Sequence, residues 1–201
     1  MNQRLNTLYA DALKRFGEIY ARAGKCGITE PNAMNLATVD PQGRPSSRVV
    51  LLKEYDQRGF VFYTNRDSQK GRDLAAVPRA ALCFYWEPLL EQVRIEGTAE
   101  SVSDQEADAY WTTRPRNSQI SAWASKQSEP LDSNATLERR MVEIAEKYRG
   151  QSVPRPSYWS GYRVVPDMIE FWQGGEYQHR IHERARYRKQ GEAWTMTLLN
   201  P

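Results

Sequence analysis

Cysteine and histidine are scarce in this chain, which has two of each among 201 residues. Cys26 and Cys83 lie far apart and in no spacing typical of metal ligands, so we expect two free thiols in a reducing compartment and no metal site. With so few histidines, a Ser-His-Asp triad has no support in the sequence. The sequence also contains no phosphate-binding P-loop, no dinucleotide GxGxxG fingerprint and no nucleophile elbow.

A strong net charge and long apolar runs are missing as well. The formal net charge is only +3, so an overall basic field gives no argument for nucleic-acid binding, and any cationic site must be local. No segment approaches the roughly 20 apolar residues of a membrane span, and the N-terminus has no apolar signal region. We therefore expect a cytoplasmic protein without nucleic-acid or membrane partners.

The residues that are present predict one folded domain in which strands predominate. Hydrophobic residues make up 40% of the chain, with 11 tyrosines and 6 tryptophans, which argues against disorder. Apolar spacing predicts helices over 5–23 and 136–148, and serines predict two more: one after Ser68, and one from Ser103 to about residue 113, with Glu106 completing a capping box. Alternating and apolar runs predict strands over 33–39, 44–53, 60–64, 80–86, 92–100, 162–166, 168–173 and a closing stretch from 177 to 199.

The connections between these elements indicate the fold class. Tight turns join the early strands, which favours antiparallel pairing over a parallel α/β sheet with crossovers. We expect a mainly β fold of the α+β class, an antiparallel barrel with helices packed outside. The domain spans 1–201, with an N-terminal helix region at 1–29 and the barrel with its flanking helices at 30–201.

A cationic stretch near the C-terminus, "YQHRIHERARYRK" (177–189), is the first candidate site. Alternate side chains of a strand share one face, which here would carry Arg180, His182, Arg184, Arg186 and Arg188. Like charges along one strand face repel, and a bound phosphate would relieve that repulsion. The alternative is a solvated outer face.

Two further candidates lie earlier in the chain. In "SRVVLLKEY" (47–55), Arg48 and Lys53 lie at an odd spacing, on opposite faces of a regular strand, and the alternative is two ordinary strand-end charges. In "YTNRDSQKGR" (63–72), Ser68, Lys70 and Arg72 lie at a strand-to-helix junction. Free backbone N–H groups and the helix dipole make such a junction a natural phosphate site, and the alternative is a basic loop.

The fourth candidate is "YWTTRPRNSQISAWASKQS" (110–128). Tyr110 and Arg114 share a helix face at i and i+4, and with Ser118 they offer two hydroxyls and a guanidinium to an oxyanion. Gln127 and Ser128 offer hydrogen bonds to a polar heterocycle. Several separate cationic clusters and many aromatic residues are most simply explained by a phosphorylated cofactor with a flat ring and a phosphorylated substrate.

The motif order resembles that of the pyridoxine/pyridoxamine 5′-phosphate oxidases from about residue 30 to 201. The resemblance rests on "PNAMNLATVD", "SRVVLLKEYD", "FVFYTN", "EQVRIEG", "RPRNSQISAWASKQS", "EFWQGG" and "RIHER". It implies an FMN-binding split β-barrel that works as a homodimer, with the flavin held between the two subunits. It also implies oxidation of pyridoxine 5′-phosphate or pyridoxamine 5′-phosphate to pyridoxal 5′-phosphate by O2, giving H2O2, and ammonia from the amine.

The resemblance also implies residue roles. Gln127 and Ser128 would reach the flavin from the second subunit, and the whole flavin-binding set would be Arg48, Val49, Val50, Leu51, Leu52, Lys53, Tyr63, Thr64, Gln69, Lys70, Gln92, Gln127, Ser128, Trp172 and Arg184. The substrate-binding set would be Lys53, Tyr110, Arg114, Ser118, Arg180 and His182. Arg180 and His182 would be the catalytic pair, orienting the ring and handling the proton while a hydride passes from C4′ of the substrate to N5 of the flavin.

Three departures from the family pattern accompany this resemblance. Gln69 stands where the family usually has a basic residue, and the hairpin between Trp172 and Arg180 is about two residues longer, which would bring Tyr177 and His179 to the substrate mouth. An N-terminal Arg and Tyr segment that closes over the substrate is not expected from this sequence, unless Met1 is not the natural start. Two alternatives stay open: a flavin oxidase of another ring, such as those of phenazine assembly, and a flavin- or pyridoxal-phosphate-binding protein with little turnover.

Overall fold

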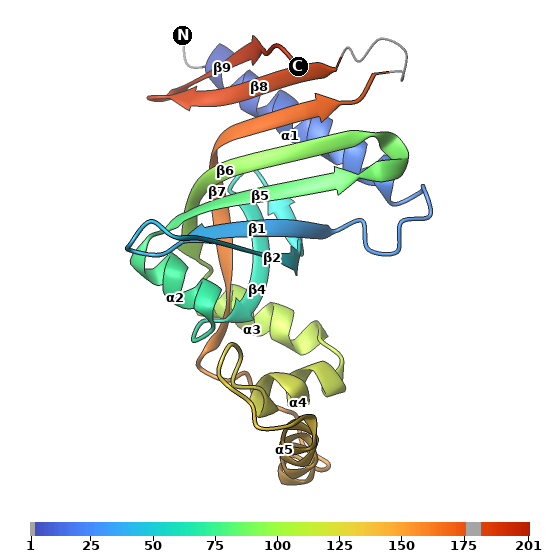
Figure 1. Cartoon of the computed structure of the whole chain (residues 1–201), viewed down its shortest axis with the longest axis vertical. Coiled ribbons are helices and arrows are strands. Elements are labelled where there is room, and N and C mark those ends of the chain that lie inside the picture. The colour runs from blue at the N-terminus through green and yellow to red at the C-terminus, as the bar shows by residue number, and fades with distance from the viewer. Residues whose placement is uncertain (1–2, 176–181) are drawn as a thin grey trace.

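The computed structural model describes residues 3–175 and 182–201 (Figure 1). Its strands are β1 (Ala33–Val39), β2 (Pro45–Leu51), β3 (Glu54–Asp56), β4 (Gly59–Asn65), β5 (Arg79–Trp86), β6 (Glu91–Ser101), β7 (Trp159–Gln173), β8 (Glu183–Gln190) and β9 (Ala193–Leu198). Its helices are α1 (Gln3–Ala23), α2 (Gln69–Ala76), α3 (Asp104–Thr113), α4 (Arg116–Ala124) and α5 (Asn134–Lys147), with a short 3₁₀ turn at Glu87–Leu89.

Strand β7 is the element that joins the two parts of the sheet. The sheet order is β2-β1-β5-β6-β7-β4-β3, and every pairing is antiparallel, as expected from the tight turns. The first part of β7 pairs with β4, from Trp159 to Val164, and its second part pairs with β8, from Met168 to Gln173. Strand β9 then continues the sheet beyond β8. One long strand thus belongs to two strand pairs that diverge, which gives the split barrel.

A bulge in the middle of β7 makes this divergence possible. Gly97 of β6 lies opposite Pro166 and Glu96 lies opposite Met168, so Asp167 is the extra residue. Proline lacks the N–H that a regular ladder needs and is tolerated at bulges. The backbones also approach closely here, because a Cβ on Gly97 would lie 2.1 Å from the carbonyl oxygen of Val165.

The expectation of two separate strands over 162–166 and 168–173 is therefore wrong: they are one bent strand, with the proline at the bend. The closing stretch differs as well. It forms two strands, β8 and β9, joined by a tight turn that contains Gly191 at φ +60. Within β8, Ala185 and Tyr187 are buried while Arg184 and Arg186 are partly exposed, so the predicted alternation is confirmed for that strand.

Helix α1 closes the barrel by burying one face against the strands. Ala12, Phe16, Ile19 and Ala23 recur at three- and four-residue spacing, and all are almost fully buried. They share one core cluster with strand residues such as Phe60 and Phe84. The ring of Phe16 meets those of Tyr55, Phe60 and Phe84 edge-on, with centroids 4.9, 5.0 and 5.3 Å apart.

Most of the other helices start where the sequence predicts. Ser68 accepts a hydrogen bond from the backbone N–H of Gly71 at the start of α2, and Ser103 with Glu106 forms the predicted capping box of α3. Helix α4 was not predicted. It begins directly after Pro115 and has no side-chain cap, and its weak amphipathic pattern gave no periodic signal.

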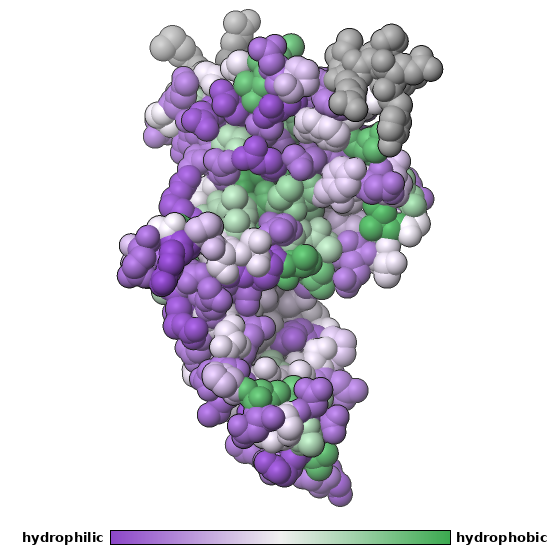
Figure 2. Space-filling view, viewed as in Figure 1, coloured by the Kyte–Doolittle hydropathy of each residue, from purple (hydrophilic) through white to green (hydrophobic). Residues whose placement is uncertain are grey.

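No helix of the described residues covers the opposite face of the sheet. In Figure 1, α1 lies behind β6, β7 and β8, and the near face of these strands is open. Figure 2 shows apolar side chains gathered over the middle of this face, between hydrophilic side chains above and below. Val49 of β2 is 66% exposed. Among the described residues, no helix combines the length and apolar character needed to cross a membrane.

We predict that Phe16→Ala lowers the free energy of unfolding by about 3–5 kcal/mol, because it leaves a cavity among rings that are held by the barrel. Chemical denaturation monitored by tryptophan fluorescence would measure this difference. Val142→Ala is the matched control, since Val142 is 61% exposed on α5 and its truncation should change stability by less than about 0.5 kcal/mol. If Phe16→Ala lowers the free energy of unfolding no more than Val142→Ala does, this account of the core is wrong.

Candidate functional site

A cavity of about 710 Å³ lies where the lower sheet edge meets the helices. Strand β2 and the segment after it supply one wall, β4 and the start of α2 a second, and α3 with α4 the third. The lining residues are Val49, Val50, Leu51, Lys53, Tyr63, Thr64, Asn65, Lys70, Tyr110, Thr113, Arg114, Pro115, Asn117, Ser118, Ser121, Ala122, Ser125, Gln127 and Trp159. The cavity therefore joins three of the four candidate segments from the sequence.

Lys70 lines the cavity and is held at the N-terminal turn of α2. Only 8% of this residue is exposed, and its ammonium donates to Ser68 Oγ at 3.2 Å and to Gln127 Oε1 at 3.1 Å. Burial, and after it the charge of Arg48, lowers the pKa of Lys70, and the charge of Asp73 opposes both effects. Its hydrogen-bond acceptors are neutral, and among the described residues no carboxylate lies within ion-pair distance. An anion at this point would therefore meet a positive charge that the more distant Asp73 offsets only in part.

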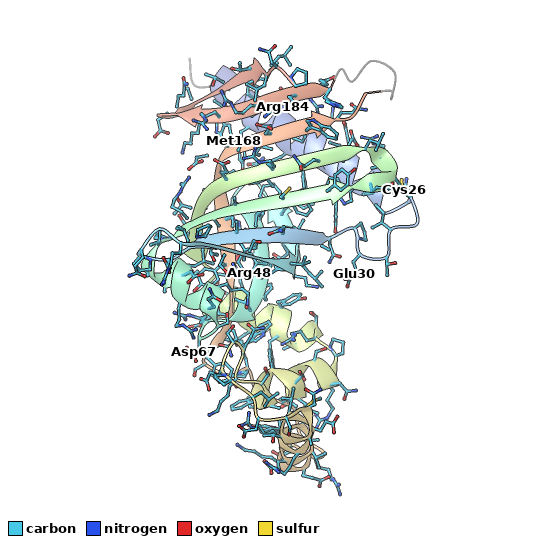
Figure 3. The ribbon with its side chains drawn as sticks, in the orientation of Figure 1. Cys26, Glu30, Arg48, Asp67, Met168 and Arg184 are labelled. Carbon is cyan, nitrogen blue, oxygen red and sulfur yellow. The ribbon has the colours of Figure 1, made fainter. Side chains whose placement is uncertain are left out.

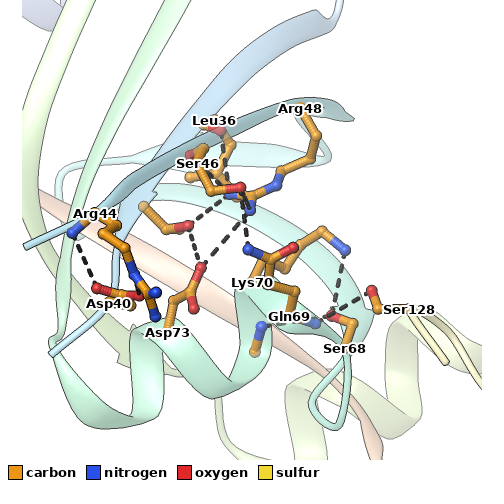
Figure 4. A network of polar contacts seen from close by, with 12 residues as sticks. Leu36, Asp40, Arg44, Ser46, Arg48, Ser68, Gln69, Lys70, Asp73 and Ser128 are labelled. Atoms are coloured by element: carbon orange, nitrogen blue, oxygen red, sulfur yellow. Dashed lines mark hydrogen bonds and ion pairs between the residues drawn. The ribbon is translucent and has the colours of Figure 1, made fainter. Parts of the chain in front are cut away.

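Arg48 lies beside this turn, in a network that Figure 4 shows. Its Nη1 donates to Thr38 Oγ1 at 2.7 Å, and Thr38 in turn donates to Asp73 Oδ2 at 2.7 Å. Its Nη2 donates to Ser46 Oγ at 2.9 Å and lies 3.7 Å from Asp73 Oδ2. The guanidinium is thus fixed by β1, β2 and α2 together. Arg48 does not line the cavity itself, whereas Lys53 does. Lys53 lies beyond the end of β2, so the opposite faces expected for a regular strand stay a prediction.

Helix α3 leads to a second cationic group, Arg114, which also lines the cavity. Glu106, Tyr110 and Arg114 follow one another at four-residue spacing, on one side of the helix. Glu106 accepts from Arg163 Nη2 at 2.7 Å and from Arg58 Nη1 at 2.9 Å, and Arg163 of β7 is only 6% exposed. One turn later, the ring of Tyr110 stacks on Tyr63 with centroids 4.1 Å apart. These contacts fix the helix on the barrel.

Arg114 ends this row with an unsatisfied charge. Its guanidinium carbon lies 4.5 Å from the ring centroid of Trp159 and 5.1 Å from that of Trp111. Its Nη1 is buried and has no hydrogen-bond partner, one of two such side-chain atoms in the part of the chain that is described. Burial lowers the pKa of Arg114, with Tyr110 opposing that effect. Ser118, on the following helix, lines the same cavity. This arrangement fits an anion that the protein does not itself provide.

Three stacked aromatic rings line the cavity as well. Tyr63 stacks on Trp159 with centroids 5.3 Å apart and planes within 5°, and Tyr110 stacks on Tyr63 in turn. Burial raises the pKa of Tyr63 to about 12, so its hydroxyl stays protonated, and it donates to the backbone carbonyl of Glu106 at 3.4 Å. A cavity lined by aromatic rings and by two cationic groups suits a ring system with phosphate groups.

A second group of predicted residues lies elsewhere on the sheet. Gln92 of β6 is directly opposite Trp172 of β7, which is directly opposite Arg184 of β8, so the three side chains form a row across these strands. The His182 ring lies 4.9 Å from that of Trp172. None of the four lines the large cavity. Figure 3 shows Arg184 on the upper strands and Arg48 near the lower edge of the sheet.

Charge partners and backbone contacts hold this row in place. Arg184 donates to Glu170 Oε1 at 2.9 Å and to the carbonyl of Asn200 at 3.1 Å. His182 Nδ1 accepts from the backbone N–H of Gly175 at 3.3 Å, which leaves Nε2 as the position for its own proton. His182 precedes β8 instead of lying in it, so it does not share the strand face predicted for it.

The structure thus divides the predicted residues into two sets. Lys53, Tyr63, Thr64, Lys70, Tyr110, Arg114, Ser118 and Gln127 meet around one cavity with Val49, Val50 and Leu51, whereas the side chain of Leu52 is buried in the core. Gln92, Trp172, His182 and Arg184 form the other set. Gln127 contacts Thr64 and Lys70, and Ser128 accepts from the N–H of Gln69, all within one chain, so these contacts need no second subunit. Arg180, Tyr177 and His179 lie outside the described residues.

Several residues of the site were missed from the sequence. Thr38 and Asp73 complete the Arg48 network, and Trp159 supports both Tyr63 and Arg114. Asp73 is three residues after Lys70 on the same helix, so the helical spacing could have flagged it. Thr38 and Trp159 have no such local signal, because strand register decides where they point.

The fold and the cavity together define a class, namely split-barrel proteins that bind small anionic ligands where the antiparallel sheet meets its helices. The family model described as pyridoxamine 5′-phosphate oxidase matches residues 22–148, and the one described as the C-terminal dimerisation region of pyridoxine 5′-phosphate oxidase matches residues 159–201. This chain belongs to the pyridoxamine 5′-phosphate oxidase family. The resemblance seen in the sequence motifs is confirmed, and the dimerisation region indicates a homodimer.

Individual relatives agree with this assignment. A pyridoxine/pyridoxamine 5′-phosphate oxidase of Myxococcus xanthus is 55% identical over 191 residues, which cover 95% of this chain and 92% of the relative. One of Rubrobacter xylanophilus is 53% identical, covering 95% and 87%. Among solved structures, PhzG from Burkholderia lata, in complex with tetrahydrophenazine-1-carboxylic acid, is 33% identical with a TM-score of 0.89 and covers 94% of this chain and 92% of its own. An FMN-binding protein of Nostoc punctiforme at 18% identity has a TM-score of 0.73, covers 92% and 96%, and supports the fold.

We predict that Glu106→Gln lowers the free energy of unfolding at pH 7 by about 1–2 kcal/mol, because Arg163 loses a charged partner. The backbone N–H of Ser103, together with the nearby arginines, holds the pKa of Glu106 below its ordinary 4.5, although burial opposes them. A lowered carboxyl pKa stabilises the fold above the ordinary value and loses that effect as pH falls through the folded-state value. The gap between wild type and variant should therefore be constant above about pH 5.5 and narrow below 4.5.

Denaturation curves at several pH values would measure this gap. Glu143→Gln on α5 is the control, because that carboxylate is 65% exposed and lies 3.9 Å from Arg139 in a surface pair. It should cost little at any pH. If the difference in free energy of unfolding between wild type and Glu106→Gln is the same at pH 3 as at pH 7, the charge of Glu106 does not anchor α3.

Proposed function

We propose that this chain oxidises pyridoxine 5′-phosphate or pyridoxamine 5′-phosphate to pyridoxal 5′-phosphate, with FMN as its cofactor and O2 as the electron acceptor. The observation that carries the proposal is a single cavity lined by two cationic groups and a stack of aromatic rings, with one buried guanidinium nitrogen that has no partner among the described residues. Two phosphorylated ligands account for both cationic groups at once. The identity of over 50% to oxidases of that name supports the same reaction.

The residues present fit FMN. Lys70, the start of α2 and the neighbouring Arg48 would hold the flavin phosphate, and Val49, Val50 and Leu51 would lie along the ring. FMN supplies the two-electron acceptor that the protein side chains lack. Phosphate oxygens would meet an ammonium whose present hydrogen-bond acceptors, Ser68 and Gln127, are neutral. The cavity therefore gains charge balance when the cofactor binds.

We propose further that the flavin site is completed at the interface of the homodimer. Gln92, Trp172, His182 and Arg184 do not line the cavity of their own chain, and the last three lie in the segment that matches the dimerisation region. The sheet face near Val49 is open and apolar in part. A second copy on this face would bring its row to the cavity of the first. Each chain acts as one domain over 1–201. A reducing compartment such as the cytoplasm is consistent with the free thiols of Cys26 and Cys83.

The chain's own residues then do the following work. Arg114, Tyr110, Ser118 and Lys53 would bind the substrate phosphate and so fix the pyridine ring in the cavity. His182, supplied by the second subunit, would hold a proton at Nε2, and Arg180 would orient the substrate ring. For the alcohol, the products are the aldehyde and H2O2. For the amine, water is also consumed and ammonia is released.

The experiment that tests this function uses purified protein. It should be yellow, and pyridoxine 5′-phosphate or pyridoxamine 5′-phosphate added without oxygen should bleach the flavin absorbance at about one flavin per substrate oxidised. Admitting air should restore the colour and release H2O2. A protein that stays colourless in excess FMN would overturn the proposal, and flavin that binds but is reduced by neither substrate would favour a binding protein.

A phenazine-type oxidase is the second candidate, and the similarity to PhzG is the observation in its favour. The ligand named for that protein carries a carboxylic acid instead of a phosphate. The orphaned Arg114 with Tyr110 and Ser118 favours a phosphate, since a dianion uses more of these donors. Bleaching by a dihydro- or tetrahydrophenazine carboxylic acid but by neither phosphorylated pyridine would favour the second candidate.

We predict that Arg114→Ala raises the KM for pyridoxine 5′-phosphate about 10- to 100-fold, the usual effect of losing a charge-assisted hydrogen bond to a ligand. The FMN content should change by less than about twofold, because Arg114 lies after α3 against Trp111 and Trp159, whereas the flavin phosphate is proposed to lie at the start of α2. Steady-state kinetics and flavin absorbance measure the two effects. Arg139→Ala, on the exposed surface of α5, controls for loss of one positive charge. Equal loss of substrate and flavin binding would mean that Arg114 meets a different anion.

A further inference from the structure

A buried carboxylate lies close to the cationic residues beside the cavity, although it does not line the cavity itself. Asp73 is only 7% exposed, it lies on α2 one turn after Lys70, and Arg48 Nη2 is 3.7 Å away. Thr38, itself 3% exposed, links the two: it accepts from Arg48 and donates to Asp73, both at 2.7 Å. A negative charge at this point is unexpected for a site that must attract a phosphate, because it opposes the same anion.

Two cations explain why the carboxylate is needed. Arg48 and Lys70 are close enough for the charge of Arg48 to lower the pKa of Lys70, and both side chains are largely shielded from water. Two like charges in such a place destabilise the folded chain. Of the two, Arg48 is the one whose guanidinium is satisfied within the chain, by Ser46, Thr38 and Asp73. Lys70 has neutral partners and remains open to the cavity.

We infer that Asp73 is a built-in counter-ion of the flavin phosphate site, which occupies Arg48 in the free protein and weakens FMN binding by competing with the phosphate for that guanidinium. This inference rests on the phosphate position proposed above. Asp73 would thus lower the affinity for FMN and at the same time stabilise the flavin-free chain. Gln69 belongs to the same network, because its Nε2 donates to Ser46 Oγ at 3.3 Å. Its side chain is neutral, so it adds no positive charge that would strengthen FMN binding.

The test is flavin binding by Asp73→Asn, measured by the quenching of flavin fluorescence in protein stripped of its cofactor. Asparagine keeps an oxygen that accepts from Thr38 and removes only the charge. The Kd for FMN should fall roughly fivefold, whereas the Kd for riboflavin, which has the same ring and no phosphate, should change by less than about twofold. The flavin-free variant should also melt at a lower temperature than the flavin-free wild type.

Controls separate this inference from the proposed function. Asp132→Asn removes the same charge from the exposed segment between α4 and α5 and should leave both Kd values unchanged. Lys70→Met should weaken FMN and spare riboflavin. If Lys70→Met changes neither, the proposed position of the phosphate is wrong. If Lys70→Met does weaken FMN binding, the result for Asp73→Asn decides the role of Asp73. An FMN Kd that is unchanged or higher, or a riboflavin Kd that falls as much as the FMN Kd, would overturn the counter-ion role. The proposed function would still stand in that case. Asp73→Ser carries the same expectation and replaces the asparagine variant if that one fails to fold.

Discussion

The bent pairing of strand β7 is the constraint on which the rest of the structure depends. Because the strand pairs with β4 before Pro166 and with β8 after it, one element supplies side chains to both parts of the molecule. Its first part carries Trp159 under the cavity and Arg163 against α3, and its second part carries Glu170 and Trp172 in the other row. The bulge at Asp167 and the side-chain-free Gly97 opposite make that bend sterically possible.

The site also depends on how positive charge is held without a ligand. Three arginines have carboxylate partners: Arg163 is paired with Glu106, Arg48 with Asp73, and Arg184 with Glu170. Lys70 has only neutral hydrogen-bond acceptors, and one nitrogen of Arg114 has none. We propose that phosphates bind at these two underpaired cations, with Arg48 contributing to the flavin phosphate. The free energy lost by burying each charge without a partner would then be recovered when a phosphate supplies that partner.

Local features were predictable from the sequence, and long-range ones were not. The capping box of Ser103 and Glu106 and the cap at Ser68 depend on residues within one turn, so their pattern was sufficient. The row of Gln92, Trp172 and Arg184 depends on the register of three strands, which no local pattern sets. Their flavin role came from the resemblance alone. The bend at Pro166 was interpreted as a strand end because proline usually interrupts pairing, and only the bulge makes it tolerable.

Asp73 was not predicted as part of the site for the same reason, because its contacts are long-range. Taken alone, Ser68, Lys70 and Arg72 predicted a cationic junction, and Arg72 turns out to donate to the backbone carbonyl of Asp67 on the exposed side. The partner of the buried site is Arg48, which is 25 residues away from Asp73 in the chain and reaches it only because β1 and β2 pack over α2. Three elements must therefore fold together before the carboxylate meets its cation. If Asp73 competes for Arg48 as we infer, cofactor binding shifts this ion pair as well as filling the cavity.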